Sequence, residues 1–179
     1  MTISVSELMI EAGQKARAAS RRMAAASTAD KNNALLRLAE LLEAKKEAIF
    51  AANERDLAKA KKNGLKESFV DRLRVTEKVL RLMAEGARQT AALPDPVDEI
   101  SEMRRRPSGI QVGRMRVPLG VLGIIYESRP NVTVDAACLA VKSGNACILR
   151  GGSEAFETNR ILGELVQQAL TETGLPTEA

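Results

Sequence analysis

The sequence contains no histidine and no tryptophan, two cysteines, and only 2% aromatic residues among its 179 positions. The lack of histidine excludes a Ser-His-Asp triad, a Cys-His dyad and a conventional zinc site within the chain. So few rings also leave little for nucleic-acid binding by base stacking. Cys138 and Cys147 lie in apolar segments, which favours packing thiols in a reducing compartment over a disulfide framework.

Charge and hydropathy are those of a globular protein. Apolar residues make up 45% of the chain and charged residues 28%, and the formal net charge is +4. A positive charge favours anionic partners, and a nucleotide cofactor satisfies it as readily as nucleic acid. No run approaches the roughly 20 apolar residues of a membrane span. Glu7 and Glu11 stand where a signal peptide would have a basic start and an uncharged apolar core. A soluble cytoplasmic protein without a membrane partner is therefore expected.

Residues 1–93 carry apolar side chains at helical spacing. One helix with a capped start is expected from 27 to about 50, and a second from 53 to 62, where Gly64 follows as a stop signal. A third starts near Thr76. The side chains expected on the buried faces of the first and third helices are Leu35, Leu38, Ala39, Leu42, Val79, Leu82, Met83 and Ala87.

The pattern changes after Pro94 and Pro96 to β-branched runs and glycines, which predicts a boundary between a helical layer, 1–93, and an α/β layer, 94–179. Residues 110–117 alternate in polarity, as an exposed ribbon or edge strand does. The basic stretch that begins at Arg104 lacks a helix that could enter a nucleic-acid groove and lacks interleaved aromatic residues. A solvated ribbon or a subunit contact is therefore favoured over nucleic-acid binding.

The rest of the chain reads as strand, helix, strand, helix. The expected elements are a strand at 119–125 buried on both faces, a helix at 133–142, a strand at 146–149 and a helix at 154–171. This order begins a doubly wound parallel sheet. Because two parallel strands neither cover their helices nor protect their edges, the chain is expected to be the first part of a larger α/β unit.

Two segments are candidates for chemistry, although neither a G-x-G-x-x-G fingerprint nor a P-loop occurs. Arg150, Gly151, Gly152 and Ser153 join a strand end to a helix start, where backbone amides and a cation suit an anionic nucleotide. A plain turn explains the same glycines. The polar segment 126–133 follows the carboxyl end of a strand, where ligands bind in open sheets. It is either a functional loop or a structural turn.

Two runs carry a family resemblance. RVPLGVLGIIYESRPNVTVD at 116–135 and KSGNACILRGGSE at 142–154 closely resemble gamma-glutamyl phosphate reductase, a branch of the aldehyde dehydrogenase superfamily. The likeness extends over the whole chain, including Asn53-x-x-Asp56, and the Y-E-x-R-P-N-V-T-V-D core distinguishes this branch. The resemblance implies the N-terminal part of such an enzyme, with a helical layer followed by the first part of a Rossmann-like parallel sheet.

The resemblance also implies a reaction. Enzymes of this family reduce L-glutamate 5-phosphate to L-glutamate 5-semialdehyde with NADPH in proline biosynthesis, and the full-length enzyme is expected to be a homo-oligomer. Their nucleophile is a cysteine in a downstream catalytic domain, and neither Cys138 nor Cys147 matches it. The chain alone is therefore expected to be inactive and to hold no metal. The alternative is a self-sufficient nucleotide-binding or assembly module without catalysis.

Individual roles follow from the same resemblance. Asn131 matches the asparagine that stabilises the oxyanion, and turn capping is its structural alternative. Arg129 is a candidate for binding the phosphate or carboxylate of the substrate. Arg150 and the turn through Ser153 match the segment that contacts the adenosine ribose, where a cation favours the 2′-phosphate of NADPH. Glu154 complicates this assignment because its negative charge stands next to the turn.

Overall fold

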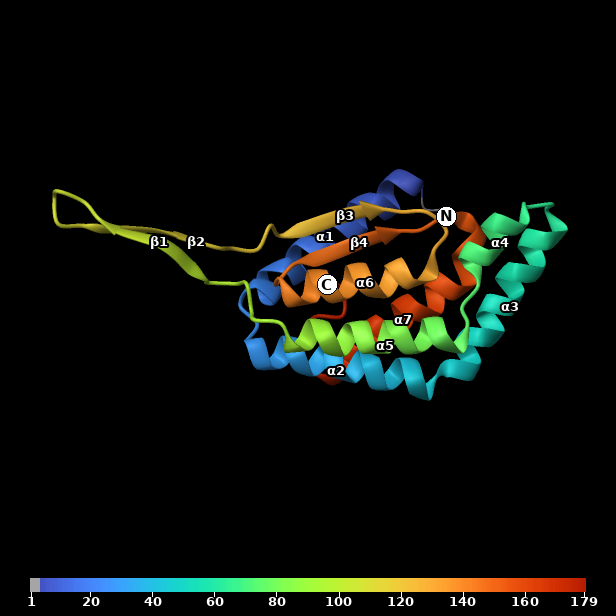
Figure 1. Cartoon of the computed structure of the whole chain (residues 1–179). Coiled ribbons are helices and arrows are strands. Elements are labelled where there is room, and N and C mark those ends of the chain that lie inside the picture. Colours follow the sequence, from blue (N-terminus) through green and yellow to red (C-terminus); the bar gives the residue numbers. More distant parts are fainter. Residues whose placement is uncertain (1–3) are drawn as a thin grey trace.

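The structure is a computed structural model that describes residues 4–179. Within that range the chain forms a helical body, a parallel pair of strands and a separate two-stranded ribbon (Figure 1). The elements in chain order are α1 (Val5–Ala24), α2 (Thr28–Ala44), α3 (Lys46–Lys62), α4 (Glu67–Leu73), α5 (Glu77–Ala92), β1 (Ile100–Arg105), β2 (Gln111–Met115), β3 (Val121–Ile125), α6 (Pro130–Lys142), β4 (Ala146–Arg150), the 3₁₀ turn η1 (Ser153–Ala155) and α7 (Phe156–Glu172).

The first predicted helix starts where its cap was expected but ends earlier. The Ser27 hydroxyl accepts a hydrogen bond from the Asp30 amide at 3.1 Å, as an N-cap does. The break between α2 and α3 lies at Lys45, so Phe50 belongs to α3 and the expected helix boundaries near 50 and 53 are wrong. The sequence of both helices contains neither glycine nor proline, and no local residue therefore marks the bend.

The main core lies between helices from both halves of the chain. α2 packs against α5 and α7, and α6 packs against α5 and α7. The buried face of α5 runs through Leu80, Met83 and Ala87, whereas Leu82 is 58% exposed, so its predicted burial is wrong. Leu82 is two positions from Leu80, about 200° around the helix, and points away from the core.

The ribbon of β1 and β2 extends away from the body (Figure 1). Its strands are antiparallel, with Ile100 opposite Met115 and Arg105 opposite Gln111. Every residue of β2 is exposed, which confirms the exposed ribbon predicted for 110–117. Its partner strand, β1, lies in a stretch for which no strand was predicted.

Strands β3 and β4 form the predicted parallel pair, joined by α6. α1 packs on both strands and α6 packs on β4. Within the described chain β3 has β4 as its one strand neighbour, and Ile125 at its end is 80% exposed. The expectation that this strand is buried on both faces is therefore wrong for these residues. Of the helices in residues 4–179, none combines the length and apolar content that crossing a membrane requires.

Candidate functional site

The two candidate segments meet at the carboxyl ends of β3 and β4. Ile125 pairs with Arg150 in the parallel register. The next amide, that of Tyr126, donates to the Arg150 carbonyl at 3.1 Å. The polar segment after β3 and the glycine turn after β4 therefore leave the sheet side by side, at the edge where open α/β sheets bind ligands.

Close packing explains both glycines of the turn. A Cβ atom on Gly151 would collide with the Asn159 amide and lie 3.1 Å from the Tyr126 ring. A Cβ atom on Gly152 would collide with the Ser128 hydroxyl. The backbone of Gly152 is extended, with φ −63° and ψ 151°, so the missing side chain and not a left-handed backbone is what this position requires.

A chain of hydroxyl and amide groups connects the first segment to the helices behind it. The Thr133 hydroxyl donates to the Asn159 side-chain oxygen at 3.0 Å. Its single proton is then committed, so the hydroxyl of Tyr126, 2.7 Å away, is the donor in their shared hydrogen bond. Burial raises the pKa of Tyr126, and the hydrogen bond to Thr133 only partly opposes that rise. Tyr126 is thus a neutral donor in this position.

Glu154 is held on the side of the turn that faces Ser128. Its carboxylate accepts a hydrogen bond from the Ser128 hydroxyl. That bond, followed by a bond to a backbone amide, lowers the pKa of Glu154. Both residues line a pocket of about 450 Å³ that sequence reasoning missed, because its opposite wall comes from the α4 region: Leu65, Phe69, Arg72 and Leu73.

Arg129 and Arg150 occupy different electrostatic settings. Arg129 is the residue before α6, and its Nε lies 3.5 Å from the Glu127 carboxylate, which Arg72 also approaches at 3.3 Å. Arg150 ends β4 with an exposed side chain, and no carboxylate within residues 4–179 lies within 4.0 Å of its guanidinium. Within the described residues, the guanidinium makes one hydrogen bond, a long one of 3.4 Å to the Gly151 carbonyl.

Asn131 lies in the first turn of α6, which begins at Pro130, although the helix was expected only from 133. Proline is favoured at the first helical position because its missing N–H has no helical partner there. The Asn131 amide donates to the Asp135 carboxylate, one turn further along α6, at 3.1 Å. The side chain therefore faces along the helix and does not cap the preceding turn.

The cysteines are set in surroundings that suppress their reactivity. Burial, with a smaller contribution from Asp135, raises the pKa of the Cys138 thiol to about 12. Burial raises the pKa of the Cys147 thiol to about 11. A catalytic thiol needs the opposite shift. In residues 4–179 no cluster of three acidic or thiol side chains is placed to hold a metal ion.

Asn53 and Asp56 fix the helix that follows the glycine turn. The Asp56 carboxylate accepts from the amides of Glu157 and Thr158, at 3.1 and 2.8 Å, and from the Thr158 hydroxyl at 2.7 Å. The Asn53 amide donates to the Thr158 hydroxyl at 3.2 Å and to the Leu73 carbonyl at 2.7 Å. A carboxylate at a helix N-terminus satisfies amides that have no partner within the helix. This pair positions the glycine turn from behind.

The whole described chain matches one family. The model of the aldehyde dehydrogenase family covers residues 4–179, and the chain belongs to that family. It is similar in particular to the solved gamma-glutamyl phosphate reductase of Thermotoga maritima, with a TM-score of 0.91 and 41% identity over 94% of this chain. The gamma-glutamyl phosphate reductase of Saccharomyces cerevisiae gives a TM-score of 0.89 and 33% identity over 99% of this chain.

The alignments also define the extent of the likeness. This chain covers 41% of the Thermotoga enzyme and 45% of the yeast enzyme, so it spans less than half of either. A NAD-dependent benzaldehyde dehydrogenase from Corynebacterium glutamicum shares the fold, with a TM-score of 0.71 at 24% identity over 94% of this chain and 34% of its own. The predicted resemblance and the predicted fold class are thus confirmed.

Proposed function

We propose that this chain is the N-terminal part of an enzyme that reduces L-glutamate 5-phosphate to L-glutamate 5-semialdehyde and phosphate, with NADPH as the reductant, in proline biosynthesis. The observation that carries the proposal is the joint sequence and structural similarity to two gamma-glutamyl phosphate reductases, at 41% and 33% identity. The similarity includes the segments that meet at the carboxyl ends of β3 and β4.

The proposal assigns a division of labour along the chain. Residues 1–93 form the helical segment, and residues 94–179 begin the NADPH-binding domain. The enzyme acts in the cytoplasm as a homo-oligomer, with neither nucleic acid nor a membrane as a partner. The raised pKa values of Cys138 and Cys147 support a nucleophile located outside these residues, because neither thiol ionises near neutral pH.

The glycine turn fits the adenosine end of NADPH. The guanidinium of Arg150 is exposed and has no carboxylate partner in the described residues, so it is available to a 2′-phosphate. Gly151, Gly152 and Ser153 offer backbone at short range. Glu154 accepts a hydrogen bond from Ser128 that lowers its pKa and favours its charged form, so its repulsion of the phosphate opposes the contribution of Arg150. When bound, NADPH supplies the reducing equivalents of the reaction.

Asn131 and Arg129 are assigned to the substrate. Asn131 donates one amide hydrogen to Asp135 and retains a second, which can stabilise the developing oxyanion of the acyl group. Replacing Asn131 by alanine is expected to lower the rate of the chemical step by about a hundredfold. Arg129 binds the phosphate or carboxylate, so Arg129→Lys is expected to raise KM by losing bidentate geometry.

The full-length enzyme tests the function directly. We expect it to oxidise glutamate 5-semialdehyde with NADP⁺ in a reaction that requires phosphate. Residues 1–179 alone are expected to show no such activity. Activity of the isolated chain would contradict an external nucleophile. Nucleotide binding without turnover by the full-length protein would instead support the module without catalysis.

The cofactor assignment has its own variant. A charge-assisted hydrogen bond from Arg150 contributes about 1.5–3 kcal/mol to binding. Arg150→Ala should therefore weaken the binding of NADPH by about ten- to a hundredfold and leave the binding of NADH nearly unchanged. Both cofactors are compared at one ionic strength. Equal losses would show that Arg150 serves the fold or the common part of the nucleotide.

A further inference from the structure

A groove of about 300 Å³ is lined by residues of α5 and α6 and does not include the glycine turn. The two helices lie side by side, and the residues that line the groove recur at intervals of three and four on each, which places them on facing surfaces. They are Gly86, Gln89, Thr90 and Leu93 of α5, and Asp135, Cys138 and Leu139 of α6.

Gly86 makes room for this groove. It is the one glycine of α5, and glycine inside a helix costs about 0.5–1 kcal/mol relative to alanine. A Cβ atom at Gly86 would lie 3.9 Å from the Asp135 Oδ1 atom. That distance is an ordinary van der Waals contact, so Gly86 faces the carboxylate and its missing side chain leaves this part of the groove open.

Asp135 carries a charge that the described chain does not neutralise. Within residues 4–179 no lysine or arginine nitrogen lies within 4.0 Å of its carboxylate. Its Oδ2 accepts the hydrogen bond from Asn131, and Oδ1 is the oxygen nearest Gly86. One carboxylate oxygen thus holds the proposed oxyanion donor, and the other is open to a cation in the groove.

We propose that Asp135 binds the α-ammonium group of an amino-acid substrate whose acyl end lies at Asn131, an inference that rests on the proposed function. The Asn131 amide and the Asp135 carboxylate lie 3.1 Å apart, and each would lie about 3 Å from the substrate group that it contacts. In glutamyl phosphate, four bonds of about 1.5 Å connect the acyl carbon to the α-nitrogen, an extended span of roughly 5 Å. One substrate molecule therefore reaches both side chains.

This arrangement gives Asp135 two separable effects. Its charge selects a substrate that carries an ammonium group, because only such a substrate gains a charge-assisted hydrogen bond from this exposed carboxylate. Its hydrogen bond orients the Asn131 amide. Asp135→Asn removes the charge and keeps an oxygen that can accept from Asn131, whereas Asp135→Ala removes both. Glu164→Gln, at an exposed ion pair on α7, is the matched control.

The test uses the full-length enzyme with L-glutamate 5-semialdehyde and with 5-oxopentanoate, which lacks the α-amino group. Asp135→Asn should raise KM for the semialdehyde about tenfold, the low end for a charged hydrogen bond, with kcat nearly unchanged. Kinetics with 5-oxopentanoate should not change. Asp135→Ala should also lower kcat with both substrates, and Glu164→Gln should match the wild type.

Equal changes in KM with both substrates would overturn the inference, as would a loss of kcat alone in Asp135→Asn. If the wild type oxidises neither substrate, the proposed function fails, and calorimetry with L-glutamate and glutarate then decides the inference separately. Tighter binding of L-glutamate than of glutarate, lost in Asp135→Asn, supports an ammonium site. The absence of that preference overturns it.

Discussion

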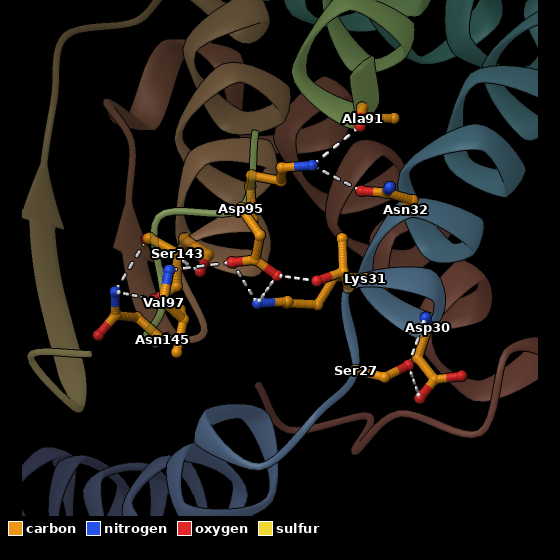
Figure 2. A network of polar contacts seen from close by, with 12 residues as sticks. Ser27, Asp30, Lys31, Asn32, Ala91, Asp95, Val97, Ser143 and Asn145 are labelled. Atoms are coloured by element: carbon orange, nitrogen blue, oxygen red, sulfur yellow. Dashed lines mark hydrogen bonds and ion pairs between the residues drawn. The ribbon is translucent and has the colours of Figure 1, made fainter. Parts of the chain in front are cut away.

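Replacing Asp95 by alanine should destabilise the protein by about 3 kcal/mol, because it isolates a buried lysine. Figure 2 shows the arrangement. The Lys31 ammonium, on a residue only 1% exposed, lies 2.6 Å from Asp95 Oδ2 and 2.8 Å from Oδ1. The same carboxylate accepts from the Thr28 hydroxyl at 2.6 Å and from the Val97 amide at 3.0 Å. The side chain of Asp95 thus ties the chain after α5 to the start of α2.

The size of the expected stability loss follows from leaving the buried charge of Lys31 without a partner. Removing one partner of a buried ion pair typically costs about 3–5 kcal/mol. The Asp95 side chain is 14% exposed, so water partly compensates and the lower end of that range applies. For a protein of this size, a loss of about 3 kcal/mol corresponds to a Tm lower by roughly 6–12 °C.

Urea unfolding of the 179-residue chain, followed by circular dichroism, measures this loss. Lys31→Met combined with Asp95→Ala should be more stable than Asp95→Ala alone, because no unpaired charge is then buried. The exposed pair on α7 supplies a control, and Glu164→Gln should change stability by less than about 1 kcal/mol. A loss below about 1 kcal/mol in Asp95→Ala would refute the reasoning.

The pair also predicts acid sensitivity. Burial alone would raise the pKa of Asp95, but hydrogen bonds from Lys31, Thr28 and the Val97 amide outweigh it and lower the pKa below its usual value. A carboxylate with a depressed folded-state pKa contributes stability above its unfolded pKa of about 3.9. That contribution is lost as the pH falls through the folded-state pKa, so the wild type and Asp95→Ala should converge in stability toward low pH.

Three further predictions concern other parts of the chain. Cys138→Ser and Cys147→Ser should each leave kcat of the full-length enzyme within about twofold, because both thiols have raised pKa values, and a large loss without unfolding would contradict their packing role. Gly163→Ala in α7 should raise the free energy of unfolding in urea by about 0.5–1 kcal/mol, since a Cβ atom there has no neighbour within 4 Å; unchanged or lower stability would refute this. Burial lowers the pKa of Lys142, so stability should rise with pH between its folded-state pKa and the unfolded value of about 10.4. Lys142→Met should lack that rise in urea midpoints measured from pH 7 to 10, and equal slopes would count against it.

Local patterns predicted the parallel pair of strands and the meeting of its two loops. The continuous apolar run at 119–125, the intervening helix and the short run at 146–149 suffice, because a strand-helix-strand unit has few allowed topologies. The start of α2 was equally predictable, since Ser27 is a strong capping residue. The family resemblance rested on the same segments.

Contacts between distant residues were beyond such patterns. Lys31 and Asp95 are far apart in the sequence, and a lysine between Asp30 and Asn32 gives no sign that it is buried against a distant partner. The α4 wall of the larger pocket and the α5 wall of the groove depend on how helices pack, which periodicity does not specify. Periodicity also failed at Leu82. Neighbouring positions on this helix are also apolar, so the sequence does not show which of them face the core. Because successive residues are about 100° apart, a small error in the assumed buried face places an exposed side chain in the predicted core.

The backbone of the glycine turn and the side chain of Arg150 are held in different ways. We therefore expect substitutions in the turn to affect the fold and substitution of Arg150 to affect ligand specificity. Asp56 fixes the start of α7, while Tyr126, Thr133 and Asn159 connect the neighbouring loop to α6 and α7. The backbone of the turn is thus constrained from both sides, and preorganised backbone loses little freedom when it binds a ligand. Arg150, by contrast, has an exposed side chain with one long contact to its own turn. Its replacement should therefore change the response to the 2′-phosphate with little effect on stability, whereas a side chain at position 151 or 152 should disrupt the turn itself.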